Sequence, residues 1–209
     1  MTAADFDLVL PEIILALASM GLLMWGTYGG GDRLAGMINW AMSALMAALA
    51  IFLMLSPREG MAFHGGFAAD RFATFAKVAI LLSAAAILIL SRDYMEKRKL
   101  LRFEFPVLIG LAVIGMMVMV SSGDLITLYM GLELQSLSLY VVAAFRRDSV
   151  KSTEAGLKYF VLGALSSGLL LYGASLVYGF TGTTRFSGIA AVVAAEQVSL
   201  GLLFGIAFL

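Results

Sequence analysis

Six long apolar stretches, separated by short polar connections, constrain what this chain can fold into more than any other feature. A helix needs about 20 mostly apolar residues to cross the hydrocarbon core of a bilayer, because each residue adds about 1.5 Å. Backbone amides in lipid must be hydrogen-bonded within their own segment, and the stretches lack the alternating polarity of membrane β-strands. We therefore predict an all-α polytopic membrane protein with spans at Leu10–Tyr28, Leu34–Leu55, Phe72–Leu90, Phe105–Val120, Leu125–Phe145 and Leu157–Phe180.

The composition agrees with a membrane protein and excludes several other classes. Of the 209 residues 61% are hydrophobic and 13% are charged, with a net charge of zero, so no nucleic-acid partner is expected. There is no cysteine, and the single histidine, His64, cannot build a metal site alone. We expect no cofactor or metal in this chain, and any redox chemistry must lie in a partner. Asp5, Asp7 and Glu12 stand where a signal peptide would be basic, so the first stretch is expected to be retained as a span.

A seventh apolar run begins near Val198 and stops at Leu209, after only twelve residues. This run is too short to cross a bilayer. We interpret residues 1–209 as a single transmembrane domain that is cut within its seventh helix and forms the N-terminal part of a longer protein. No internal repeat is visible in the sequence.

The basic residues outside the spans are distributed unevenly between the two sides of the predicted bundle. Nine fall in the connections after spans one, three and five, and three fall on the opposite side. Because cytoplasmic loops carry the excess of lysine and arginine, the N-terminus is predicted to face away from the cytoplasm. The nine are Arg33, Arg92, Lys97, Arg98, Lys99, Arg102, Arg146, Arg147 and Lys151, and the three are Arg58, Arg71 and Arg185.

Glu133 lies near the middle of the fifth span, where its short side chain cannot reach either membrane surface. A charge at a helix centre costs about 2.5–3.5 kcal/mol to insert, so such residues usually have a task. A desolvated carboxyl has its pKa raised toward neutrality, where it can take up and release protons. The alternative is a protonated glutamate that only joins two helices. Residues at helical spacing form a polar face with it: Tyr129, Ser136 and Tyr140.

Two lysines also lie within spans. Lys158 follows Glu154 by four residues, the favoured spacing for a helical ion pair, so spacing alone leaves a boundary lysine and a functional lysine open. We expect Lys158 to lie about 10–15 Å from Glu133 in depth, too far for direct contact. Lys77 is predicted to extend its side chain to the nearby membrane surface.

Three further predictions concern local structure. Asp124 is expected to cap the helix that follows it, and His64 is expected to be a solvated loop side chain. In the sixth span, Gly163 with Ser167 and Ala164 with Gly168 are small residues four apart. Such pairs let another helix approach closely, so this span is predicted to pack inside the bundle.

The stretches "GDLITLYMGLELQSLSLYVVAAFRRD" and "STEAGLKYFVLGALSSGLLLYGASLVYGFTG" resemble the antiporter-like membrane subunits of proton-pumping NADH-quinone oxidoreductase, respiratory complex I, and most of all its subunit N. The resemblance implies a fourteen-helix fold with halves of inverted topology, of which this chain holds the first part. It also implies that Glu133 and Lys158 take part in a proton relay, whose partner lysine on the seventh helix lies beyond Leu209.

The same resemblance implies the assembly in which the chain works. Flavin, iron-sulfur clusters and quinone are expected in other subunits of the complex, and the location is expected to be a bacterial inner membrane. Two alternatives stay open at this point. One is a subunit of a multisubunit sodium/proton antiporter, which resembles the same family, and the other is a scaffold whose buried charges only specify helix pairing.

Overall fold

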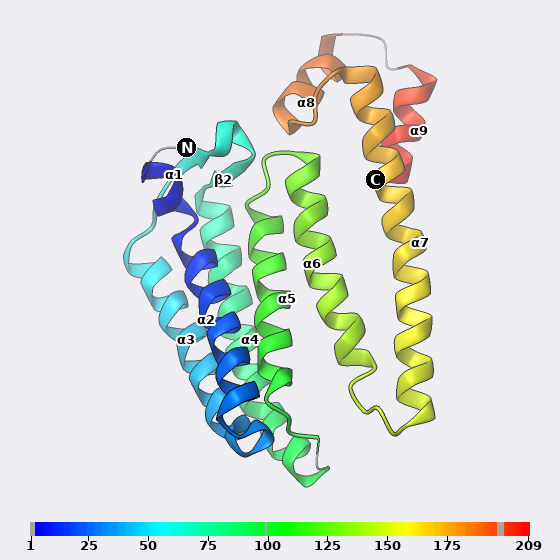
Figure 1. Cartoon of the computed structure of the whole chain (residues 1–209). Helices are drawn as coiled ribbons and strands as arrows, with labels where there is room; N and C mark the ends of the chain where they lie inside the picture. The colour runs from blue at the N-terminus through cyan, green and yellow to red at the C-terminus, as the bar shows by residue number, and fades with distance from the viewer. Residues whose placement is uncertain (1–2, 99, 196–198) are drawn as a thin grey trace.

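A computed structural model describes residues 3–98, 100–195 and 199–209 as a bundle of antiparallel helices with a small β-hairpin at one end (Figure 1). Short 3-10 turns lie at Gly31–Leu34 and Phe63–Gly65. The hairpin strands are β1 (Gly60–Ala62) and β2 (Phe67–Ala69), which pair antiparallel. The helices are α1 (Ala3–Leu8), α2 (Leu10–Gly29), α3 (Ala35–Leu55), α4 (Arg71–Lys97), α5 (Glu104–Val120), α6 (Leu125–Ala143), α7 (Val150–Thr181), α8 (Phe186–Ala195) and α9 (Leu200–Phe208).

Five of the described helical segments are long and apolar enough to cross a membrane. They are α2, α3 together with the 3-10 turn before it, α4, α6, and α7. The fourth predicted span corresponds to α5, whose 17 residues measure about 26 Å at 1.5 Å per residue. That length lies at the lower limit for a membrane span. The fold is therefore a multi-pass helical membrane bundle, and α4 and α7 each extend about seven residues beyond the predicted span at their polar end.

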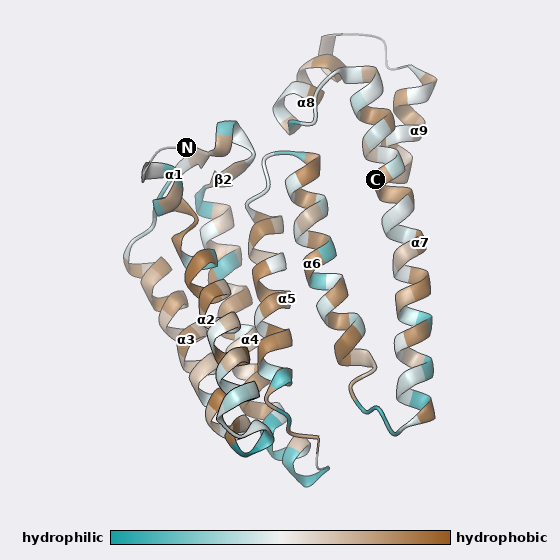
Figure 2. Cartoon of the chain, in the orientation of Figure 1, coloured by the Kyte–Doolittle hydropathy of each residue, from teal (hydrophilic) through white to brown (hydrophobic). Residues whose placement is uncertain are grey.

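Hydrophilic residues gather at one end of the bundle, where α2 leads into α3, α4 into α5 and α6 into α7 (Figure 2), and the sequence of these connections is rich in lysine and arginine. We call this the basic end, and it includes Arg33, Arg98 and Arg147. The other end carries α1, the β-hairpin and α8, and we call it the hairpin end (Figure 1). The alternating direction of the helices brings the basic connections together on one side, as the sequence predicts.

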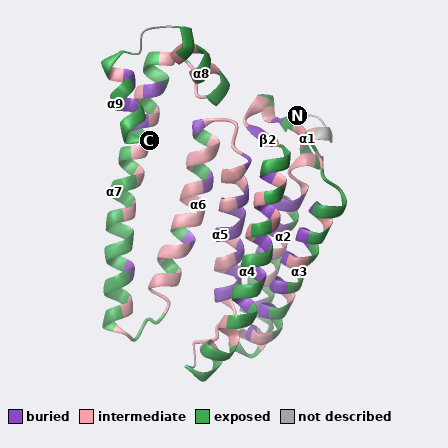
Figure 3. Cartoon of the chain, turned by 180° about the vertical axis from the view of Figure 1, so that it is seen from behind, coloured by how far each residue is buried: buried purple, intermediate pink, exposed green. Residues whose placement is uncertain are grey.

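The most buried part of the bundle is formed by α2, α3, α4 and α5 (Figure 3). Apolar side chains such as Met42, Leu81 and Met117 are fully buried there, and dispersion contacts hold the helices together where no water can drive association. Two polar residues of α3 also bond across to α4. Asn39 Nδ2 donates to the Leu88 carbonyl at 3.0 Å, and Ser43 Oγ donates to that of Ala85 at 3.2 Å.

Helices α5 and α6 cross closely because two glycines face each other. A Cβ at Gly115 would lie 2.6 Å from the carbonyl oxygen of Gly131, and one at Gly131 would lie 2.8 Å from the carbonyl oxygen of Gly115. Backbone atoms cannot move aside as a flexible side chain can, so only glycine fits at this crossing. The crossing fixes the position of α6, and with it Glu133, two residues further along.

Helix α7 lies at the edge of the bundle, which corrects the prediction that the sixth span packs inside it (Figure 3). One small-residue pair, Gly163 and Ser167, is partly buried against α6, as predicted. The other pair, Ala164 and Gly168, is exposed, and nothing lies within 4 Å of a Cβ built at Gly168. Within the described residues the main contacts of α7 are with α6, α8 and α9, and only one of its two small-residue pairs is partly buried.

The hairpin end contains elements that the sequence did not predict. The hairpin joins the α5–α6 turn through hydrogen bonds from Ala68 N to Ser121 O and from Gly123 N to Gly66 O, at 2.7 and 2.9 Å. The short apolar helix α8 was missed because its ten residues are too few to register as a span. Helix α9 begins at Leu200, and the predicted start of the seventh span at Val198 lies outside the described residues.

Candidate functional site

Glu133 is the ninth residue of α6, about 12 Å from the start of the helix and about 15 Å from its end. The start of α6 is set by Asp124, whose Oδ1 accepts a hydrogen bond from Thr127 N at 2.6 Å. This confirms the predicted cap. The carboxyl of Glu133 therefore sits at mid-depth in a membrane-spanning helix, where it is partly buried.

A hydroxyl of α7 meets this carboxyl. Ser167 Oγ donates a hydrogen bond to Glu133 Oε1, and the hydroxyl of Tyr129 lies 3.1 Å from the same Ser167 oxygen. Two residues of the predicted polar face are thus joined through one residue of the neighbouring helix. Sequence reasoning assigned Ser167 only a packing role, although its hydroxyl could have marked it as a hydrogen-bonding partner.

Ser136 and Tyr140, the other two residues of the predicted polar face, line a cavity of about 390 Å³ between α6 and α7. Ser167, whose hydroxyl donates to Glu133, also lines this cavity. Its polar side chains are of the kind that hold water, and it is large enough for several water molecules. Gln135, Tyr159 and Ser166 complete the polar lining.

Tyr140 is held firmly against α7. Its ring packs edge-on against Tyr159 and Phe160, with ring centroids 4.8 and 5.7 Å away. Gly163 makes room for its hydroxyl, because a Cβ at that position would overlap the Tyr140 oxygen. The glycine that was predicted as a helix-packing residue therefore accommodates a polar side chain of the site.

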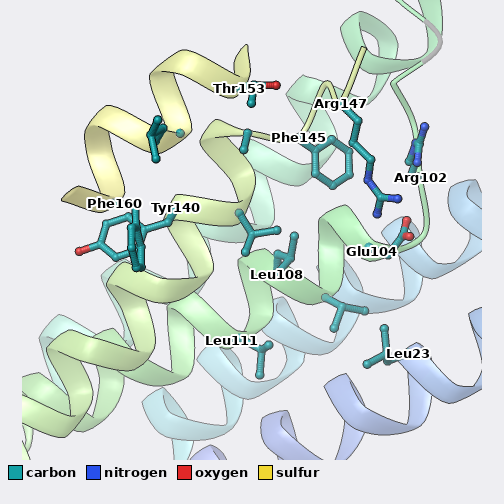
Figure 4. A pocket seen from close by; sticks show the side chains of 15 residues that line it. Leu23, Arg102, Glu104, Leu108, Leu111, Tyr140, Phe145, Arg147, Thr153 and Phe160 are labelled. Carbon is teal, nitrogen blue, oxygen red and sulfur yellow. The ribbon is translucent and has the colours of Figure 1, made fainter. Parts of the chain in front are cut away.

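Tyr140 also lines a second, larger groove of about 640 Å³ at the basic end. Figure 4 shows this groove with Arg102, Glu104 and Arg147 at one side, Tyr140 and Phe160 at the other, and apolar side chains between them. Tyr140 therefore stands between the groove at the basic end and the polar cavity beside Ser167.

Lys158 is not brought to Glu133 in this structure. Its Nζ lies 2.5 Å from Glu154 Oε1, and the two side chains are 70% and 55% exposed. Along α7, Lys158 is nine residues from Ser167, or about 14 Å, which agrees with the predicted separation in depth. The structure therefore contains the helical ion pair that the spacing allowed, and an exposed pair of this kind contributes little stability.

The prediction that Lys77 reaches the membrane surface is wrong. The Lys77 side chain is 3% exposed, and its Nζ lies 2.6 Å from Oε1 of Glu12, whose side chain is 4% exposed. Helix α1 and the hairpin fold over this end of α2 and α4 and close the route to the surface (Figure 1). In the sequence Glu12 argues only against a signal peptide, and nothing links it to a residue 65 positions away. His64, by contrast, is exposed in its loop, as predicted.

The fold and site define the class: a membrane helix bundle that holds a hydrogen-bonded carboxyl at mid-depth beside a cavity lined by both polar and apolar side chains. Comparison with known families agrees. Residues 122–209, which contain α6, α7 and the whole of this site, match the model of the NADH:quinone oxidoreductase/Mrp antiporter transmembrane family.

The particular relatives are N subunits of NADH-quinone oxidoreductase. Over all 209 residues the chain is 63% identical to "NADH-quinone oxidoreductase subunit N" of Rhodobacter capsulatus, of which it covers 44%. The resemblance drawn from the two sequence stretches is therefore confirmed, and it extends along the entire chain. The chain spans less than half the length of the relatives that it matches.

Solved structures show the same fold. A chain of respiratory complex I from Thermus thermophilus matches with a TM-score of 0.76 and 29% identity, over 95% of this chain and 42% of that one. A chain of the Mrp complex from a Dietzia species matches with a TM-score of 0.71 over 91% of this chain and 22% of that one. At 20% identity the second match shows only that the fold is shared.

Proposed function

We propose that this chain is part of a proton-translocating membrane subunit of NADH-quinone oxidoreductase, in which Glu133 gains and loses a proton as its local field changes. The observation that carries the proposal is the hydrogen-bonded connection from Glu133 through Ser167 to Tyr129 at mid-depth in the bundle. A glutamate that served only to join helices would need one partner and no adjacent polar cavity.

The chemistry requires groups that can both give and accept a proton. A hydroxyl does both, so a proton that reaches Ser167 can pass to Glu133 while Ser167 takes another from Tyr129 or from water in the cavity. Ser167 then receives one hydrogen and gives one, Glu133 gains one, and the donor, Tyr129 or water, recovers its own from further water. The proposed entry of protons is at the basic end, and it is supported by the position of Tyr140, which lines both the cavity and the groove at that end.

Lys158 belongs to the relay in this proposal, but its role requires a change from the conformation described above. Its ammonium must leave Glu154 and communicate with Glu133 through ordered water, since about 14 Å of helix separates it from Ser167. A lysine beyond Leu209 is the other proposed partner of Glu133.

The wider assembly follows from the same proposal. The whole subunit has the fourteen-helix fold of two inverted halves, and residues 1–209 belong to one transmembrane domain of it. Flavin, iron-sulfur clusters and quinone belong to other subunits of the complex. The basic end faces the cytoplasm of a bacterium, and the hairpin end faces the other side of the inner membrane.

Purification of the complete, tagged protein from its own membranes tests the assignment to the complex. We expect redox subunits to copurify and the preparation to oxidise NADH with quinone as acceptor. A preparation that lacks redox subunits and exchanges sodium for protons when reconstituted would contradict it and favour a multisubunit antiporter.

Replacement of Ser167 by alanine tests the hydrogen-bonded connection. The change removes the link between Glu133 and Tyr129 while it adds no bulk. We expect proton translocation to fall about 10- to 100-fold, because loss of one hydrogen bond to a charged group costs about 1.5–3 kcal/mol. Ser166→Ala is the matched control, since Ser166 lines the same cavity but does not contact Glu133. Equal pumping by the two variants, measured in proteoliposomes, would refute the role of Ser167.

A further inference from the structure

A second buried ionisable pair lies at the hairpin end, far from the Glu133 site. Glu12 near the start of α2 and Lys77 near the start of α4 face each other, with Lys77 Nζ 2.6 Å from Glu12 Oε1. The contact lies outside hydrogen-bond geometry, and Glu12 Oε2 has no hydrogen-bond partner in the described part of the chain. The two side chains therefore interact as an ion pair, and the second carboxylate oxygen of Glu12 accepts no hydrogen bond from the described residues.

Helix α1 and the hairpin cover this pair. The ring of Phe67 in β2 lies under the ammonium of Lys77, with Nζ 4.6 Å from the ring centroid, a distance typical of a cation–π contact. Arg58, in the segment between α3 and β1, binds to α1. Its Nη1 lies 3.1 Å from Asp7 Oδ1 of α1 and donates to the Asp7 carbonyl at 2.7 Å.

A cavity of about 20 Å³ adjoins Lys77 beneath this cover. That volume is enough for about one water molecule, and the polar side chains around it are suitable partners. Asp7, Ser56, Arg58 and Thr74 line it together with Lys77, whereas Glu12 does not reach it. Two of the side chains that line the cavity, Asp7 and Arg58, are 62% and 38% exposed, so the cavity lies between the buried Lys77 and side chains that reach the surface.

Helix packing alone does not account for such a pair. Two buried charges pay a desolvation cost that their attraction often fails to recover, and apolar residues of similar size would join α2 to α4 as well or better. Charged groups at this end of the bundle come from several elements. Arg58 and Asp7 face the cavity, Asp5 lies on α1, Asp70 caps the start of α4, and Glu59 with Arg71 forms an exposed pair nearby. Helix α3 carries no charged residue, and Glu104 of α5 lies at the basic end.

We propose that Glu12 and Lys77 form a second proton-transfer site, which exchanges protons with water at the hairpin end. A proton that arrives at the unused Oε2 of Glu12 neutralises the carboxylate and removes the partner of the Lys77 ammonium. Lys77 then gives one of its protons to water in the cavity and becomes a neutral amine. Transfer of the Glu12 proton to that amine restores the ion pair, so that one proton has entered at Glu12 and one has left at Lys77.

The double variant Glu12→Gln/Lys77→Met in the complete complex separates proton transfer from structure. It leaves no unpaired buried charge, so we expect the complex to assemble and to reduce quinone at the normal rate. Proton transfer at this site is abolished, and we expect the complex in proteoliposomes to lose the share of protons per NADH that passes through this subunit. An assembled double variant with an unchanged ratio would show that the pair is structural and overturn the proposal.

A second variant keeps the test decisive if the double variant does not assemble. Thr74→Leu fills the cavity beside Lys77 and leaves both charges in place, whereas Thr74→Ser preserves its polarity and size. We expect pumping to be slowed severalfold by leucine and unaffected by serine, and equal pumping by both would overturn the proposal. The proposal and its tests concern Glu12, Lys77 and Thr74, which lie apart from the Glu133 site. Failure of this proposal therefore leaves the proposed function intact.

Discussion

Replacement of Glu133 by glutamine is expected to stop proton translocation through this subunit while the complex still assembles. Glutamine has the same shape, and its carbonyl can still accept the hydrogen bond from Ser167, so the α6–α7 contact survives. The amide cannot bind and release a proton at physiological pH. Removal of a positioned acid–base group typically costs 10²–10⁴-fold, so we expect translocation through this chain to fall by about 100-fold or more.

The measurement is the number of protons pumped per NADH in proteoliposomes that contain the complete complex. Glu96→Gln is the matched control, because Glu96 is an exposed carboxylate of α4 at the basic end. Assembly and NADH oxidation by uncoupled membranes should be unchanged in both variants. If Glu133→Gln and Glu133→Ala both pump at the normal ratio, Glu133 only joins helices and the mechanism fails.

Valine at Gly131 is expected to have the largest effect on assembly. The new Cβ would lie 2.8 Å from the Gly115 carbonyl oxygen and 2.9 Å from Met119 N, and both are backbone atoms that cannot turn aside. Helix α6 must move away from α5, and Glu133 moves with it. Overpacking of this kind costs about 1–3 kcal/mol or more, a large part of the stability of most proteins.

We expect much less assembled complex in membranes and a lower thermal midpoint for what remains. Gly21→Val in α2 is the control, because nothing lies within 4 Å of a Cβ at Gly21. Valine at position 21 should therefore change assembly and thermal stability only slightly. Normal assembly and stability of the Gly131 variant would mean that the α5–α6 crossing is not as close as the structure describes.

Sequence patterns predicted the helices and part of the site because those features depend on local rules. An apolar run of sufficient length is helical in lipid whatever surrounds it, and a helical repeat places Tyr129 and Glu133 on one face. The cap at Asp124 is equally local, and the hydrogen bond from Thr127 confirms it. These predictions needed no knowledge of which helices are neighbours.

Features that depend on contacts between distant segments could not be predicted. Ser167 lies 34 residues from Glu133, and no spacing rule joins them. Lys77 was expected at the surface because it lies near a helix end, where lysine normally reaches water. The hairpin and α1 close that route, and Glu12 then becomes its partner. The family resemblance identified Glu133 and Lys158 but carried no information about the Glu12–Lys77 pair.

Infrared difference spectroscopy of the complete complex during turnover tests the central claim most directly, because the C=O stretch of a protonated carboxyl reports its protonation. We predict that a carboxyl band appears or disappears when NADH and quinone are added, shifts in deuterated water, and is absent from the Glu133→Gln variant. A spectrum in which turnover changes no band that depends on Glu133 would contradict the claim that this carboxyl exchanges its proton.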